Sequence, residues 1–176
     1  MRVVPLLLFV TIVLAGCQAP DRSGCPARAL AQVGRDEALR GLPASLPKAD
    51  CALDEAEQQR YLAGRTEGLK RFCRAERGYK LGLDGKAVDG SLCSADDAKE
   101  LQRGFEVGDN LRQFLSRHDS LLAQARDSER LAARSPENSA EARAHEDKAA
   151  GLRFDARQQE NEVEALRAIV AVEKWR

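Results

Sequence analysis

The sequence predicts an all-α protein, in which a small disulfide-stapled helical head with a glycine-rich loop precedes a long antiparallel helical hairpin. Two observations support this prediction. Apolar residues recur at helical spacing through residues 96–174, with one interruption at Arg134-Ser135-Pro136. Apart from Cys17, all cysteines lie between residues 25 and 93. We therefore divide the chain into a head, residues 25–111, and an arm, residues 112–176.

The N-terminal segment is typical of a bacterial lipoprotein signal. Arg2 precedes an apolar run over residues 3–15, and Leu14-Ala15-Gly16-Cys17 ends this run with small residues before a cysteine. The run is shorter than the ~20 apolar residues of a permanent membrane span. We expect residues 1–16 to be removed, Cys17 to carry lipid, and residues 17–24 to form a polar tether.

This signal predicts a lipid-anchored protein of the bacterial cell envelope. Gln18 after the lipidated cysteine favours the outer membrane, with the protein facing the periplasm. The chain has 28 basic and 28 acidic residues, and these charges alternate as on solvated helix faces. A nucleic-acid partner is not expected, since it would require a basic patch.

Four cysteines remain when Cys17 is assigned to lipid: Cys25, Cys51, Cys73 and Cys93. In an oxidising compartment an even set predicts two disulfides, each adding roughly 3 kcal/mol of stability. Three pairings are possible, and the sequence does not choose between them. A zinc site is the weaker interpretation because the chain lacks a CxxC pair, so we expect no metal and no cofactor.

The head begins with two predicted helices. The first covers residues 27–41, with Pro26 at its first turn and Gly41 at its end. Residues 42–48 contain two prolines and are interpreted as a linker. The second helix runs from Asp54 to about residue 74, and Glu57 completes a capping box at its start.

Residues 75–93 contain four glycines and are predicted to form a loop, with a short β-hairpin around Asp84-Gly85. Two long helices follow, over residues 96–133 and 137–174. Each would be ~57 Å long. Ser94 is the expected cap of the first, and Ser135 with Pro136 the expected start of the second. Apolar residues in the second follow a heptad pattern. The equal lengths of the two helices and the short proline-containing turn between them predict an antiparallel helical hairpin.

Residues 61–73, YLAGRTEGLKRFC, resemble the YxxGRxxGLxxYC signature of the DUF2799 family of bacterial envelope proteins. The matching positions are Tyr61, Gly64, Arg65, Gly68, Leu69, Phe72 and Cys73. Further glycines and cysteines in the family's order extend the resemblance over about residues 25–111. The resemblance implies an envelope location and a fold but no reaction.

The signature also has a physical interpretation. Gly64 and Gly68 lie four residues apart on one helix face, and each costs ~1 kcal/mol relative to alanine in a helix interior. Such glycines favour close approach of another element, either the 75–93 loop or the first helix between Gly34 and Gly41.

Arg65 shares this face and has two interpretations. It is a structural arginine bound to loop carbonyls or to Asp36, Asp84 or Asp89, or it binds a carboxylate or phosphate group of a ligand.

Catalytic motifs are not recognisable in this sequence. His118 and His145 stand singly on charged helices, without neighbours at ligand spacing. The sequence therefore favours a non-enzymatic binding or structural protein whose arm engages a periplasmic partner. The alternative is a small-anion or glycan-binding head formed by Arg65 and the 75–93 loop. A second alternative is an uncharacterised envelope enzyme.

Overall fold

The computed structural model describes residues 29–45 and 53–175, and within them it contains five helices and no strand. The helices are α1 (Leu30–Leu39), α2 (Glu55–Phe72), α3 (Ala75–Leu83), α4 (Ala95–Ala132) and α5 (Ala140–Glu173). The all-α prediction is confirmed. The predicted signal, the tether, Cys17, Cys25 and Cys51 lie outside the described residues.

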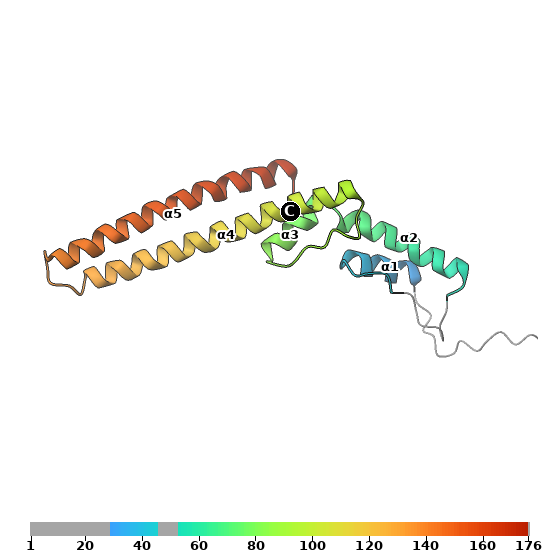
Figure 1. Cartoon of the computed structure of the whole chain (residues 1–176), viewed down its shortest axis with the longest axis horizontal. Helices are drawn as coiled ribbons and strands as arrows, with labels where there is room; N and C mark the ends of the chain where they lie inside the picture. Colours follow the sequence, from blue (N-terminus) through green and yellow to red (C-terminus); the bar gives the residue numbers. More distant parts are fainter. Residues whose placement is uncertain (1–28, 46–52, 176) are drawn as a thin grey trace, which may run out of the picture.

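The helices pack in three pairs: α1 with α2, α3 with α4, and α4 with α5. In Figure 1, α1, α2 and α3 lie toward one end of α4, whereas the rest of α4 runs beside α5 away from them. The 38 residues of α4 therefore belong partly to the head and partly to the arm. None of the described helices is long and apolar enough to cross a membrane.

Glycines bring α1 and α2 into backbone contact. A Cβ atom on Gly64 would overlap the carbonyl of Ala31, and one on Gly68 would clash with Arg35 and Ala38. Residues later in α1 contact residues later in α2, so the two helices run in the same direction. The predicted approach of the first helix to the signature glycines is confirmed.

The prediction of a loop over residues 75–93 is wrong for its first half, because residues 75–83 form α3. Its glycines do not break the helix, since Gly78 and Gly82 face the backbone of α4, where a Cβ would clash with Leu101 and Phe105. Asp84-Gly85 ends this helix instead of turning a β-hairpin. Gly85 has φ +65°, and the following N–H of Lys86 donates to the carbonyl of Leu81.

Other helix boundaries differ less from the prediction. The capping box is present: the Asp54 carboxylate accepts from the Glu57 N–H at 2.8 Å, and the Glu57 carboxylate accepts from the Asp54 N–H at 3.0 Å. The last helix begins at Ala140 and not at residue 137, because Ser139 caps it by accepting from the N–H of Ala142. Pro136 lies in the preceding turn.

One apolar cluster joins the end of α2 to the α3–α4 pair. It contains the buried residues Phe72, Cys73, Leu81 and Leu101, with Leu69, Val88, Cys93 and Phe105 packed against them. A disulfide between Cys73 and Cys93 closes the same junction. This pair is one of the two predicted disulfides, and the covalent link and the cluster together fix α2 onto the α3–α4 pair.

The buried seam between α4 and α5 in the arm is narrow. On α5 its buried positions are Ala142, Ala149, Ala156 and Val163, each seven residues from the next. The predicted heptad pattern is confirmed for these positions. At the other end of α5, Trp175 is only 6% exposed and lies against the head. Its ring centroid is 5.8 Å from that of Tyr79.

Candidate functional site

The α1–α2 pair carries a polar cluster formed by Glu37, Ser45 and Tyr61, in which Tyr61 is buried, Glu37 is half-buried and Ser45 is exposed. The hydroxyl of Tyr61 and the hydroxyl of Ser45 each donate to the Glu37 carboxylate at 2.6 Å. The backbone N–H of Ser45 donates to the Tyr61 hydroxyl oxygen at 3.1 Å. These bonds hold residues 42–45, which follow α1 and which we call the strap, across the helix pair.

Local sequence explains the course of the strap. Gly41 has φ +70°, a conformation that favours glycine, and the N–H of Leu42 donates to the carbonyl of Glu37. This reversal ends α1 and directs the chain back over α2. It places the Leu42 carbonyl and the Ser45 side chain beside the two signature residues Tyr61 and Arg65.

Arg65 is 7% exposed. Its Nη2 donates to the Leu42 carbonyl at 2.7 Å, whereas Nη1 is buried without a hydrogen-bond partner among the described residues. A buried donor left unsatisfied costs about 1–3 kcal/mol. The guanidinium thus has one bond to a neutral oxygen, which is weak compensation for a buried charge.

The acidic partners expected for Arg65 are engaged elsewhere. Asp36 accepts from Gln32, Asp84 pairs with Lys86, and Asp89 accepts from the N–H of Ser91. The expected carbonyl bond is present, from the residue that follows Gly41. Of the two kinds of partner expected for a structural Arg65, the described residues therefore supply the carbonyl and not the aspartate.

The hydrogen bonds of the cluster shift two pKa values in opposite directions. Burial opposes ionisation of Glu37, but bonds from Ser45 and Tyr61 and the charge of Arg65 outweigh it, so the pKa of Glu37 is lowered. Burial raises the pKa of Tyr61, and the bond that it donates to the Glu37 carboxylate raises it further. The cluster therefore contains an ionised carboxylate and a neutral phenol, and the buried guanidinium of Arg65 acts on both through its charge.

The remaining signature residues at the end of α2 pack in the junction cluster, and the two histidines, which the sequence does not predict to form a site, lie beside single carboxylates. Phe72 and Cys73 are buried in the junction cluster, with Leu69 packed against it. His118 lies beside Asp119 at 3.1 Å, and His145 is 4.0 Å from Glu141, one turn away on the same helix. Within the described residues, histidine, cysteine, aspartate and glutamate side chains form no group that could hold a metal ion.

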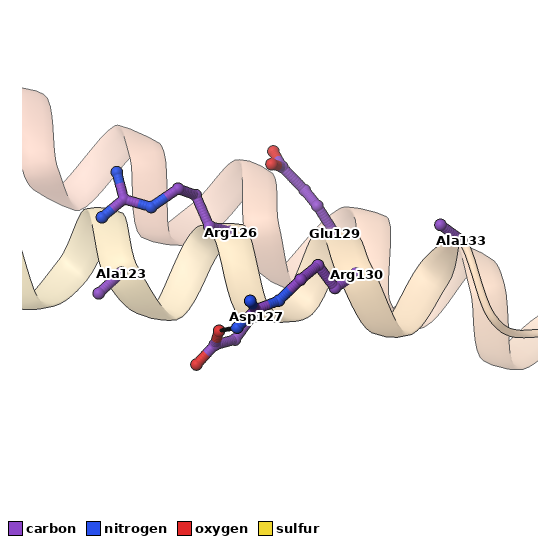
Figure 2. Close-up of a pocket in the computed structure, with 6 residues that line it drawn as sticks. All are labelled: Ala123, Arg126, Asp127, Glu129, Arg130 and Ala133. Atoms are coloured by element: carbon purple, nitrogen blue, oxygen red, sulfur yellow. Dashed lines mark hydrogen bonds and ion pairs between the residues drawn. The ribbon is translucent and has the colours of Figure 1, made fainter.

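A shallow depression lies on α4 near its turn to α5, lined by Ala123, Arg126, Asp127, Glu129, Arg130 and Ala133 (Figure 2). Asp127 pairs with Arg130, and Glu129 pairs with Arg153 of α5 at 2.5 Å. Figure 2 shows that the six side chains leave one helix in different directions. They do not converge as the groups of a ligand site do.

Sequence reasoning missed Glu37, Leu42 and Ser45 as neighbours of the signature residues. The available signal was Gly41, since a glycine in a positive-φ turn commonly ends a helix and changes the direction of the chain. It also missed Trp175, whose contact with Tyr79 bridges about a hundred residues of sequence and has no local signal.

Comparison with known proteins gives a family and a distant relative. A family model described as "Protein of unknown function (DUF2799)" matches residues 31–110, which span α1 to the first half of α4. The "Uncharacterized protein YfiL" of Escherichia coli (strain K12) is 29% identical over 111 residues, which are 60% of this chain and 87% of the relative. No solved structure matches. The second half of α4 and all of α5 lie outside the family model.

Proposed function

Since residues 31–110 belong to the DUF2799 family, which is described as of unknown function, we propose a function from the geometry of this chain. It is a non-enzymatic, lipid-anchored protein of the bacterial envelope, and its arm engages a protein partner in the periplasm. The observation that carries this proposal is the arm itself. It extends away from the head (Figure 1) and lies outside the family model.

The surface of the arm supports this role. Its seam is filled mainly by alanines, while larger apolar side chains remain on the outside: Leu131 is 47% exposed and Phe154 is 55% exposed. Phe154 lies on α5 beside Arg157, whose guanidinium is 5.9 Å from the ring centroid. Exposed aromatic and arginine side chains are the types enriched in protein interfaces.

An alternative function is a small-anion or glycan site shared by Arg65 and residues 75–93. The structure gives Arg65 its hydrogen bond to Leu42, in the α1–α2 pair. Residues 75–83 pack on α4 instead. A site that combines both therefore has no support in the geometry, and any anion site would have to be built by Arg65 and its own helix pair.

Site-specific photo-crosslinking in intact cells tests the proposed function. A photoreactive amino acid replaces Phe154 or Leu131 on the arm, and Leu62, which is 44% exposed on α2 of the head, serves as the matched control. We expect an adduct of defined mass from the arm positions and none from Leu62. A second variant, Val163→Asp, places a charge in the buried seam and should abolish the adduct.

Two outcomes would refute the proposal. One is an equal yield of adduct from Leu62 and from the arm positions. The other is an adduct that persists unchanged in the Val163→Asp variant, since a partner that recognises the paired helices requires an intact seam.

A further inference from the structure

The head contains two copies of one helix-pair unit. Unit one is α1 with α2, and unit two is α3 with the first half of α4. In unit one, Gly34 faces the backbone of Tyr61 and Arg65. In unit two, Gly78 faces the backbone of Leu101 and Phe105 in the same way. The first helices are offset by 44 residues and the second helices by 40.

The same offsets relate the ends of the units. Gly41 and Gly85 end the first helices with φ +70° and +65°, and each turn has the same pair of backbone hydrogen bonds. Asp54 and Ser94 cap the second helices, and each accepts from the N–H three residues later. The units therefore agree in helix direction, glycine contacts, turn and cap.

The interiors of the two units differ in chemistry. Glu37, Tyr61 and Arg65 of unit one correspond to Leu81, Leu101 and Phe105 of unit two. The unit-two residues are apolar and belong to the junction cluster. The same backbone arrangement thus forms with an entirely apolar set, so packing of the unit does not require the polar set. The Glu37 carboxylate acts on the Arg65 guanidinium through its charge, but Nη1 stays buried without a hydrogen-bond partner among the described residues. A buried donor left unsatisfied opposes folding, and its presence calls for another explanation.

We propose that Arg65 is a binding site for a carboxylate or phosphate group, closed in this structure by the strap at residues 42–45. The planar guanidinium suits two oxygens of one anion. Nη1 has no partner among the described residues, and Nη2 holds the Leu42 carbonyl oxygen, which occupies the place of one anion oxygen. Binding exchanges this neutral oxygen for a charged group and satisfies Nη1.

The strap determines how the site opens. Three hydrogen bonds besides that of Arg65 involve the strap: the Leu42 N–H to Glu37, and the two that Ser45 makes with Glu37 and Tyr61. Glu37 is negative and disfavours a second anion nearby, so the site prefers a singly charged group. Tyr61 moderates this repulsion because its hydroxyl donates to the Glu37 carboxylate. Anion binding should therefore release Ser45 while Tyr61 and Glu37 stay paired.

Hydrogen exchange of the full chain in detergent tests this proposal, with sodium phosphate, sodium acetate and sodium chloride added at equal ionic strength. We expect phosphate or acetate to accelerate exchange of the Ser45 N–H saturably, by about tenfold, whereas chloride has no effect. A response to only one of the two anions assigns the ligand group. Arg35→Gln is the matched control, because Arg35 is a partly exposed arginine of the same helix pair and is paired with Glu67.

Two variants separate binding from folding. Arg65→Phe introduces the unit-two residue, and we expect a folded protein whose Ser45 exchange is the same in phosphate, acetate and chloride. Arg65→Lys keeps the charge without the planar fork and should weaken the saturable response. The proposal is overturned if neither anion gives a saturable response, if Arg35→Gln loses it as Arg65→Phe does, or if Arg65→Phe fails to fold.

Discussion

Replacing Gly64 with alanine is expected to destabilise the head, although alanine is the better helix former. In an exposed helix interior this change stabilises by about 1 kcal/mol. At Gly64 the added Cβ would overlap the carbonyl oxygen of Ala31 and lie 2.5 Å from its carbonyl carbon and 2.7 Å from its Cα. The position of the Cβ is fixed by the backbone of α2, and the atoms it would meet belong to the backbone of α1, so no side-chain rotation relieves the contact.

The net effect can be estimated from these two opposing contributions. Overpacking of a well-packed interior costs typically 1–3 kcal/mol, and a contact between two helix backbones belongs at the upper end of this range. After the gain in helix propensity, Gly64→Ala should lower the free energy of unfolding by about 2 kcal/mol. For a chain of this size this corresponds to a melting temperature about 4–8 °C lower.

Gly151 provides the matched control. It lies in the interior of α5 with nothing within 4 Å of the position where a Cβ would be added. Gly151→Ala should therefore stabilise by about 1 kcal/mol, which separates the two variants by about 3 kcal/mol. Thermal and denaturant unfolding by circular dichroism measure both. If Gly64→Ala stabilises the protein as Gly151→Ala does, the close contact of α1 with α2 is refuted.

Three further predictions concern the junction, the arm and the polar cluster. Tyr79→Ala should shift the emission of Trp175, the one tryptophan of the chain, to longer wavelength, because the ring loses its cover; unchanged emission would contradict this contact. Reduction of the Cys73–Cys93 disulfide, with a sequence separation of 20, should cost about 3 kcal/mol of stability, and an unfolding midpoint unaffected by reductant would argue against it. The pKa of Glu37 is lowered in the folded state, so its ionisation contributes folding stability that is complete above the ordinary pKa of 4.5 and is lost as the pH falls through the lower folded pKa. Glu37→Gln should reduce this loss of stability at acid pH. An unchanged dependence of the free energy of unfolding on pH would disprove the assignment.

The features that could be predicted from the sequence are those with local or periodic signals. The capping box of Asp54 and Glu57 and the heptad of α5 are patterns of adjacent turns, and both are present. The close approach at Gly64 could also be predicted, because glycine in a helix interior opposes the helix and requires a compensating contact. The sequence left two alternatives for the element that packs against Gly64, the first helix and residues 75–93, and the structure shows the first helix, α1.

The errors arise where tertiary packing reverses a local preference. Four glycines in residues 75–93 suggest a loop, yet Gly78 and Gly82 are helical because α4 leaves no room for a side chain there. A glycine that breaks an isolated helix is the residue that allows two helices to touch. Comparing the spacing of glycines in residues 75–108 with that in residues 31–68 would have indicated the second helix pair, since the two sets repeat.

The Cys73–Cys93 disulfide reduces the possible pairings of the four cysteines. Two disulfides were predicted with three possible pairings, and the bond between Cys73 and Cys93 leaves Cys25 and Cys51 as the remaining pair. These two cysteines lie outside the described residues, so the second disulfide stays a prediction. Mass spectrometry of non-reduced peptides checks it, and a free thiol at either position would contradict it.

The arm lies outside the residues that the family model matches, and it is attached to the head at two points. The family model ends at residue 110, within α4, and α4 continues from there without a break. At the other end of the arm, Arg103 of α4 pairs with Glu173 at 2.9 Å and lies 5.0 Å from the ring of Trp175. A helix that is continuous with the head and a second helix that is held by its C-terminal end cannot swing independently. The arm is therefore held in a defined position relative to α3 and the first half of α4.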